Sequence, residues 1–310
     1  TFDAGVILDH AVRRVEGGLR GQPVVQAQLY DHIGQIYQTY ARYDEAEPLL
    51  YRALAVRRSV HGDGHLDVAE SLNHVAWLAF VQGDYAAADS LYTVAYGVAR
   101  RIGADRSPSA ASSLEGRGLI RRALGDPEGG AALVREALAI REATLGPDHP
   151  DVEAALAALG SLLYNMGRHD EAAPLLRRVV ASRRRTLGDH LHTAQSLSDY
   201  GAVLAAQGAT DAALRAHREA LDLRRGILGD SHPHVAQSLS HMGWVLQTQE
   251  RWAEAEDLYR EALRIRRAHF GDPHTSIGNS LLMLGESLEL QGDVHRGLGL
   301  VAEAVRTFHA

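Results

Sequence analysis

Five histidines recur at matching places along the chain, and histidine is a common ligand of transition metals. They are His65, His149, His190, His232 and His274. Each comes just before a segment with helical periodicity, as in Asp148-His149-Pro150, where proline suits the first helical position and a polar side chain can cap. Equivalent side chains in neighbouring repeats lie at least roughly 8–10 Å apart, one helix packing distance, whereas zinc ligands lie about 2 Å from a shared ion. We therefore expect capping histidines, and we predict no metal site and no cofactor.

The sequence contains residue types that catalyse hydrolysis in known enzymes. A hydrolase triad could be drawn from Ser196, Asp199 and His241, but no nucleophile-elbow motif orients it. Paired acids of the kind that glycosidases use are Glu254 with Glu256 and Asp170 with Glu171. These acids fall at the starts of predicted helices, where carboxylates favour the positive end of the helix dipole. We predict no catalytic residue and no enzyme activity in this chain.

The composition excludes several functions. All 32 basic residues among the 310 are arginine, so a phosphate-loop lysine, a kinase lysine and a Schiff-base lysine are absent. The absence of cysteine removes thiol nucleophiles, disulfides and thiolate metal sites, and leaves the redox compartment open. A formal net charge of −7 argues against nucleic-acid binding. No apolar run approaches the roughly 20 residues of a spanning helix, so we expect no membrane insertion by this segment.

The helices that would position these residues are predicted from a sequence repeat. Glycine recurs with spacings of 41, 43, 42, 41 and 42 residues, at Gly62, Gly103, Gly146, Gly188, Gly229 and Gly271. A second turn divides each period, at Gly83, Gly125, Gly167, Gly208 and Gly292, with Ala41 and Glu250 at the equivalent places of two repeats. Each period of about 42 residues therefore predicts two helices.

The apolar residues support paired helices that stack. In the sixth period, Val235, Leu239, Met242 and Leu246 form one stripe of an amphipathic helix. Because one helix pair cannot cover its own apolar face, stability requires stacking on neighbours. We predict an all-α superhelical solenoid of antiparallel helix pairs. It has a leading helix at 1–20 and seven repeats in one continuous array, at about 21–62, 63–103, 104–146, 147–188, 189–229, 230–271 and 272–310.

The third repeat departs from the others in composition. Pro127, Gly129 and Gly130 lie where the other repeats have a bulky residue and alanine. Glycine in a helix costs about 1 kcal/mol relative to alanine. We therefore expect local irregularity in this repeat.

Several segments resemble tetratricopeptide repeats of the kinesin-light-chain type. The clearest are Leu72-Asn73-His74-Val75-Ala76 followed by Gln82-Gly83-Asp84-Tyr85, and Arg42-Tyr43-Asp44-Glu45-Ala46-Glu47-Pro48-Leu49-Leu50. The resemblance covers about residues 21–310. It implies a scaffold that binds a protein or peptide segment along the concave face formed by the first helices.

The first 50 residues also resemble the entry to the repeat tails of bacterial membrane-anchored serine/threonine kinases. The segments that carry this resemblance are Ile7-Leu8-Asp9-His10-Ala11, Gln22-Pro23-Val24-Val25-Gln26-Ala27 and Ile33-Gly34-Gln35-Ile36-Tyr37. The resemblance implies a location outside the cytoplasm if a membrane helix and kinase precede this segment. Otherwise we expect a cytoplasmic protein. The kinase motifs His-Arg-Asp and Asp-Phe-Gly are absent, so any kinase activity would belong to other sequence.

The resemblance also implies which residues face the groove: the position just after the small alanine or glycine of each first helix, and the position three further on. In chain order these are Gln35 and Gln38, Trp77 and Phe80, Leu119 and Arg122, Ser161 and Tyr164, Ala202 and Ala205, Trp244 and Gln247, and Glu286 and Glu289. The predicted peptide-binding residues are Gln35, Gln38, Asn73, Trp77, Phe80, Arg122, Tyr164, Asn165, Trp244 and Gln247. Aromatic anchors supply much of the energy of an interface, and amides can hold a peptide backbone. Alternatively, Trp77 and Trp244 only fill space between adjacent first helices.

Two further features are read as structural. Arginine pairs recur at the ends of second helices, at Arg57-Arg58, Arg100-Arg101, Arg183-Arg184-Arg185, Arg224-Arg225 and Arg266-Arg267. Cations there complement the helix dipole, so we expect solvated side chains, with a stripe for an acidic partner as the alternative. Trp252 takes the place of Tyr43 and Tyr85 between paired helices, and we expect it in the core.

These observations favour a protein interaction module, the sensor or scaffold tail of a signalling protein. One alternative is a regulatory segment of a serine/threonine kinase whose catalytic domain lies in other sequence. Another is a self-associating scaffold, since Leu298, Val301, Val305 and Phe308 form an apolar stripe in the last predicted helix. That stripe predicts weak homodimerisation through a terminus.

Overall fold

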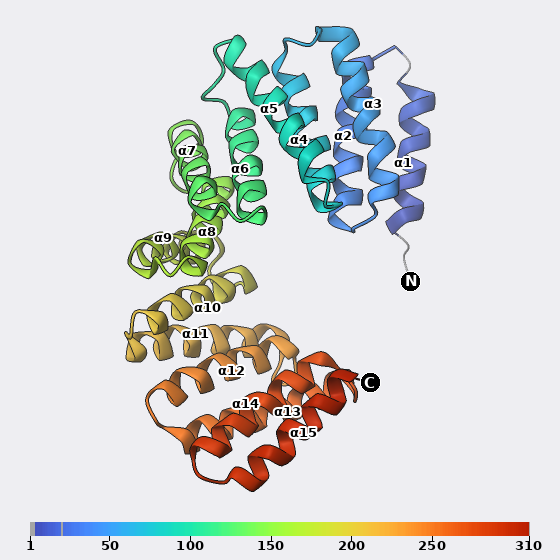
Figure 1. Cartoon of the computed structure of the whole chain (residues 1–310). Helices are drawn as coiled ribbons and strands as arrows, with labels where there is room; N and C mark the ends of the chain where they lie inside the picture. The colour runs from blue at the N-terminus through green and yellow to red at the C-terminus, as the bar shows by residue number, and fades with distance from the viewer. Residues whose placement is uncertain (1–3, 20, 310) are drawn as a thin grey trace. The chain divides into compact units, whose positions relative to one another are not determined.

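The computed structural model describes residues 4–19 and 21–309, and these residues form fifteen helices and no strand (Figure 1). The prediction of an all-α helical repeat array with one leading helix is confirmed. By their contacts the residues divide into two compact units, 1–155 and 156–310, and each unit is described by itself. Of the predicted leading helix 1–20, residues 1–3 and 20 lie outside the described residues, as does residue 310 of the last repeat.

After the leading helix α1, the helices alternate between first and second members of a pair, so that even-numbered helices are first members and odd-numbered helices are second members. In chain order they are α1 (Ala4–Gly18), α2 (Pro23–Thr39), α3 (Tyr43–His61), α4 (Leu66–Val81), α5 (Tyr85–Arg101), α6 (Pro108–Ala123), α7 (Pro127–Leu145), α8 (Pro150–Asn165), α9 (His169–Leu187), α10 (Leu191–Ala206), α11 (Thr210–Leu228), α12 (Pro233–Thr248), α13 (Trp252–Phe270), α14 (Thr275–Leu290) and α15 (Val294–His309). In the first unit α2 packs on α3, α4 on α5 and α6 on α7 (Figure 1). In the second, α10 packs on α11, α12 on α13 and α14 on α15.

The turns lie where the repeat predicts them. Every glycine of the two recurring series has a positive φ, from 58° at Gly188 to 91° at Gly292. Ala41 and Glu250, which replace glycine in two repeats, also adopt the left-handed region, with φ of 55° and 59°. These are the non-glycine residues with positive φ in the described part of the chain. The turn geometry is therefore imposed by the repeat even where the residue type disfavours it.

Small residues on first helices receive large residues from second helices. A Cβ atom added to Gly34 would lie 2.7 Å from Leu50, and one added to Gly243 would lie 2.7 Å from the Tyr259 ring. Alanines on the second helices, such as Ala46 and Ala255, are 0% exposed. This pairing of small and large side chains brings the two helices of a repeat together.

The third pair is regular, so the expectation of local irregularity was wrong. Pro127 stands in the first turn of α7, where its missing N–H group breaks no helical bond, and Asp126 caps the helix. Gly118 of α6 and Gly130 of α7 meet backbone to backbone: a Cβ atom on Gly118 would lie 2.8 Å from the Gly130 carbonyl oxygen. The glycines therefore permit close packing that a larger residue would prevent.

In four of the five arginine pairs, the first arginine turns inward. Arg224 is 2% exposed and donates to Ser238 Oγ at 2.7 Å and to Gln195 Oε1 at 2.8 Å. The same arrangement joins Arg57 to Ser71, Arg183 to Ser196 and Arg266 to Ser280. Each arginine–serine bond links a second helix to the next first helix. The expectation that these side chains are all solvated was wrong, because their partners lie in a neighbouring repeat.

In three of these pairs, all in the second unit, the second arginine is partly exposed and joins neighbouring second helices. Arg225 of α11 contacts Glu261 of α13 at 2.8 Å. The same contact joins Arg184 to Glu219 and Arg267 to Glu303. In the second unit this arginine stripe is therefore occupied by acids of the chain itself, which weakens the case for an acidic partner.

Candidate interaction surface

In the first unit, the first helices bring several predicted groove residues to one surface. Gln35 and Gln38 are half-buried on α2, Trp77 is 40% exposed on α4, and Arg122 is exposed at the end of α6. Helix α4 contacts both α2 and α6. The predicted positions on these three helices thus form one strip across neighbouring repeats.

Two hollows flank Trp77 on this strip. One, of about 440 Å³, is lined by Gln35, Gln38, Thr39, Tyr43, His74, Trp77 and Val81. The other, of about 450 Å³, is lined by Glu70, Asn73, His74, Trp77, Tyr92, Pro108, Ser109, Ser112, Glu115, Gly116, Leu119 and Asp151. Trp77 and His74 line both hollows. The Trp77 side chain therefore separates two recesses, each large enough for a side chain.

Trp77 is supported by a row of aromatic side chains. Its ring stacks on Phe80 with centroids 5.3 Å apart, and Phe80 contacts Tyr85 of α5 at 5.6 Å. Phe80 and Tyr85 are only half-exposed. Phe80 therefore holds Trp77 in place more than it offers surface of its own, which fixes the orientation of the exposed ring.

The predicted amides of α2 bond to α4. Gln38 Nε2 donates to the His74 carbonyl oxygen at 3.3 Å, and Gln35 Nε2 lies 3.4 Å from His74 Nδ1. The same imidazole nitrogen lies 2.8 Å from Asp31 Oδ1. These half-buried amides keep further donor and acceptor capacity toward the hollow.

Asn73 takes a structural position. It is 5% exposed, and its Nδ2 donates to the Ser109 carbonyl oxygen at 2.8 Å while its Oδ1 accepts from Ser113 Oγ at 2.7 Å. Its amide therefore joins α4 to α6, and few of its polar groups remain for a ligand.

In the second unit the predicted binding residues differ more from one another in exposure and in their contacts. Trp244 of α12 is 43% exposed, and Gln247 accepts a hydrogen bond from the Tyr259 hydroxyl at 3.2 Å. Tyr164 is half-buried against His169, with ring centroids 5.3 Å apart, and Asn165 is exposed. Trp252, expected in the core, is half-buried instead.

Sequence reasoning missed Tyr92, which lines the larger hollow of the first unit. Its ring is 3% exposed, and a Cβ atom on Gly116 of α6 would lie only 2.2 Å from Tyr92 Cζ. Gly116 therefore makes room for the hydroxyl-bearing end of a ring that starts on α5. Burial and the nearby Glu115 carboxylate raise the pKa of the Tyr92 hydroxyl, so it stays protonated. The feature of the sequence that could have indicated this contact was the glycine at position 116.

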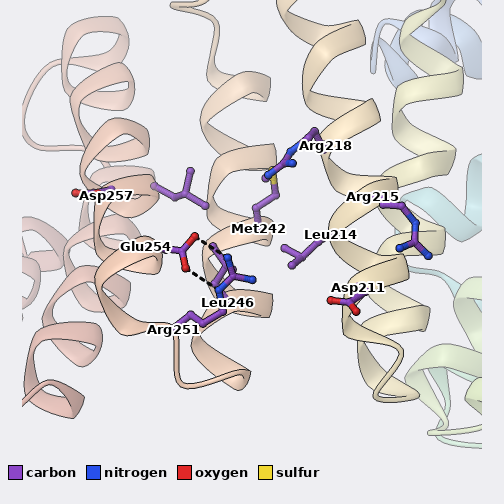
Figure 2. Close-up of a pocket in the computed structure, with 10 residues that line it drawn as sticks. Asp211, Leu214, Arg215, Arg218, Met242, Leu246, Arg251, Glu254 and Asp257 are labelled. Atoms are coloured by element: carbon purple, nitrogen blue, oxygen red, sulfur yellow. Dashed lines mark hydrogen bonds and ion pairs between the residues drawn. The ribbon is translucent and has the colours of Figure 1, made fainter.

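A further hollow, of about 480 Å³, lies among α11, α12 and α13 of the second unit (Figure 2). Leu214, Met242, Leu246 and Leu258 supply apolar surface, and three acids and three arginines surround them. Figure 2 shows two hydrogen bonds between Arg251 and Glu254, at 2.7 and 2.6 Å. Because the charges balance, this hollow selects no charge in a ligand. Most of its lining residues lie on the second helices α11 and α13, whereas the predicted groove residues lie on first helices.

The candidate catalytic groups are engaged in structural contacts. Ser196 Oγ donates to the His192 carbonyl oxygen at 2.8 Å and accepts from Arg183 at 2.6 Å. His241 packs against His217 with ring centroids 5.3 Å apart. The paired acids are bonded likewise, in the contacts Arg251–Glu254, Arg260–Glu256, Gln207–Asp170 and Arg168–Glu171.

The capping role of the recurring histidines is confirmed. In all five, Nδ1 accepts the backbone N–H group two residues ahead, at 3.1–3.2 Å. One group among the described residues could offer three metal ligands, namely His61, His65 and Asp67. However, His65 Nδ1 already accepts the Asp67 N–H group. The repeat-equivalent Phe270 and His274 stack in the same way, at 4.0 Å against 4.2 Å for His61 and His65, although phenylalanine cannot bind a metal.

One known protein family matches most of this chain. The model of a family described as Tetratricopeptide repeat matches residues 25–101, 109–185, 151–226, 192–268 and 245–308. No curated protein sequence matches the chain significantly. No helix in the described residues has the length and apolarity needed to cross a membrane.

Solved structures share the fold at low sequence identity. A putative kinesin light chain with nearly identical TPR-like repeats from Podosopora anserina is 21% identical, with 66% of this chain and 98% of that chain covered and a TM-score of 0.61. BtubC (BKLC) from P. vanneervenii is 20% identical over 71% of this chain and 89% of that chain, with a TM-score of 0.59. A STAND protein with a tetratricopeptide repeat sensor, PH0952 from Pyrococcus horikoshii, is 12% identical, with 99% and 48% covered and a TM-score of 0.72.

Proposed function

Because the chain belongs to the tetratricopeptide repeat family, we propose that it is a protein interaction module that binds a peptide segment along the first helices of its first unit. Tetratricopeptide repeats serve as interaction scaffolds rather than catalytic folds. The proposed surface consists of Gln35, Gln38, Trp77, Leu119 and Arg122, with Phe80 as support. The binding role of Tyr164, Asn165, Trp244 and Gln247 in the second unit stays a prediction.

The observation that supports this proposal most is the position of Trp77. A tryptophan that is 40% exposed and stacked on Phe80 is a rigid apolar anchor. Recesses on both sides can receive alternate side chains of an extended segment. Interface energy concentrates on such aromatic residues, especially where neighbouring contacts exclude water.

The test begins with the chain as bait for proteins of its native host, followed by mapping of the bound segment with overlapping peptides. We expect a short linear segment to bind by itself and to compete with the whole partner. A partner that binds only as a folded domain, with no active peptide, would contradict the peptide-groove proposal.

The kinase-tail alternative rests on the resemblance of the first 50 residues. The STAND protein contains a repeat array described as a sensor, which supports a sensor role within a larger signalling protein. The gene sequence upstream of the codon for Thr1 decides this alternative. A membrane span and kinase motifs there would support it, and their absence would exclude it.

Self-association is a second candidate function because α15 has an exposed apolar face. Leu298 and Val305 are 56% and 48% exposed, and Phe308 is 42% exposed although its ring packs against Gly278. Exposed apolar patches on a repeat array favour association. The proposal is a weak homodimer through this face.

A further inference from the structure

Two tyrosines occupy the same place in their repeats but differ at the hydroxyl group. Tyr259 of α13 packs against Gly243, and its hydroxyl donates to Gln247. Tyr92 of α5 has the equivalent register, but its ring packs against Gly116 of the following helix α6, where no residue accepts from its hydroxyl. Tyr92 as a residue is 3% exposed, and its hydroxyl has no hydrogen-bond partner among the described residues, although it is not one of the fully buried atoms that lack a partner. The hydroxyl therefore keeps its donor and acceptor capacity for a molecule that enters the hollow that Tyr92 lines.

Tyr92 lines a hollow with negative charge. Glu70, Glu115 and Asp151 line it, and no lysine or arginine does. Two arginines lie behind this lining with side chains 6% and 9% exposed: Arg57 is 3.4 Å from Glu70, and Arg141 is 2.6 Å from Glu115.

The buried arginines leave part of this negative charge uncompensated. Arg57 also pairs with the buried Asp31, so its charge is shared between two carboxylates. The side chains of Glu70 and Asp151 are 51% and 60% exposed, and both can accept bonds from a ligand. The hollow therefore combines an aromatic wall with an excess of carboxylates, which is complementary to a cation.

We propose that this hollow binds the guanidinium group of an arginine in the partner segment, an inference that rests on the proposed function. A guanidinium group is planar, so it can lie against the exposed face of Trp77 while its N–H groups donate to Glu70 and to the Tyr92 oxygen. An ammonium group offers no flat face and fewer directed donors. The site thus selects arginine over lysine in an otherwise extended peptide.

The experiment selects peptides from a random phage-displayed library on the full chain and compares their composition with the input library. We expect enrichment of arginine over lysine. The affinity of a selected peptide is then measured by fluorescence anisotropy against the parent chain, Glu70→Gln and Tyr92→Phe. Each variant should weaken the arginine peptide about tenfold, the effect of one hydrogen bond to a charged group. Neither should weaken a version with glutamine in place of arginine.

Tyr259→Phe is the matched control, because it removes the equivalent hydroxyl in the other unit and should leave affinity unchanged. Tyr92→Phe should unfold at the parent temperature, since its hydroxyl has no partner within the chain. A lysine peptide that binds as tightly as the arginine peptide would contradict the guanidinium assignment. Peptides that need Trp77 but show no coupling to Tyr92 or Glu70 would overturn this inference alone. Failure to select any peptide would overturn the proposed function together with it.

Discussion

Gly118 and Gly130 face each other across the α6–α7 pair so closely that each excludes a side chain on the other. A Cβ atom on Gly118 would lie 2.8 Å from the Gly130 carbonyl oxygen, and one on Gly130 would lie 2.6 Å from the Gly118 carbonyl oxygen. Gly285 and Gly297 repeat the arrangement in α14 and α15, at 3.0 and 2.8 Å. Glycine at these places serves helix packing, although it lowers helix propensity.

Gly130→Ala should therefore destabilise the first unit by about 1–3 kcal/mol, the cost of overpacking, despite the better helix propensity of alanine. Gly97→Ala in α5 is the matched control, because nothing lies within 4 Å of its added Cβ atom. The control should stabilise by about 0.4–1 kcal/mol. Urea unfolding followed by circular dichroism measures both. Stabilisation by Gly130→Ala would show that the backbones separate at little cost.

Arg224 and Arg225 are neighbours with opposite environments, and their alanine variants should differ strongly. Arg224→Ala leaves Ser238 and Gln195 without their buried donor and should cost about 1–3 kcal/mol for each group left unsatisfied. Arg225→Ala removes a surface ion pair and should cost no more than about 1 kcal/mol. Chemical denaturation compares them, and equal losses would argue against the inward arginine as a link between repeats.

The stability of the second unit should fall with acid because of His217. Burial, helped by His241 and Arg224, lowers the pKa of His217 to about 3. Since the unfolded chain then binds a proton more readily than the folded one, this contribution is complete above about pH 6.5 and is lost as pH falls toward 3. At pH 5 the loss is about 2 kcal/mol for one such histidine.

The test for His217 is the substitution His217→Leu, because leucine occupies the equivalent place against Gly34 and Gly160 at Leu50 and Leu176. The difference in unfolding free energy between pH 7.5 and pH 5 should shrink by about 2 kcal/mol in this variant. An unchanged difference would assign the acid sensitivity to other groups.

Self-association through α15 predicts a concentration-dependent sedimentation coefficient. Replacing Leu298 and Val305 by glutamine should abolish that dependence, because it removes apolar surface that is about half-exposed. Val94→Gln on α5, also 45% exposed, is the control and should sediment like the parent chain. A strict monomer at high concentration would contradict the homodimer proposal.

The sequence predicted the helix pairs, their turns and the positions of first-helix residues, because these depend on a period that is visible in one chain. Even Ala41 and Glu250 could be placed in turns from register alone. Contacts between repeats could not be predicted. The inward turn of Arg224, the approach of Gly118 to Gly130 and the reach of Tyr92 past Gly116 each depend on residues brought together by packing. Single-chain periodicity carries no signal for such pairs.

The central claim is that a partner segment binds on both sides of Trp77, and Trp77→Ala tests it most directly. Titration of the mapped peptide should show affinity reduced at least about tenfold, the scale of an interface hot spot, with little change in unfolding temperature. Tyr51→Ala removes another exposed aromatic of the first unit, 48% exposed on α3, and should bind like the parent. A Trp77→Ala chain that folds and binds the peptide with parental affinity would contradict the claim.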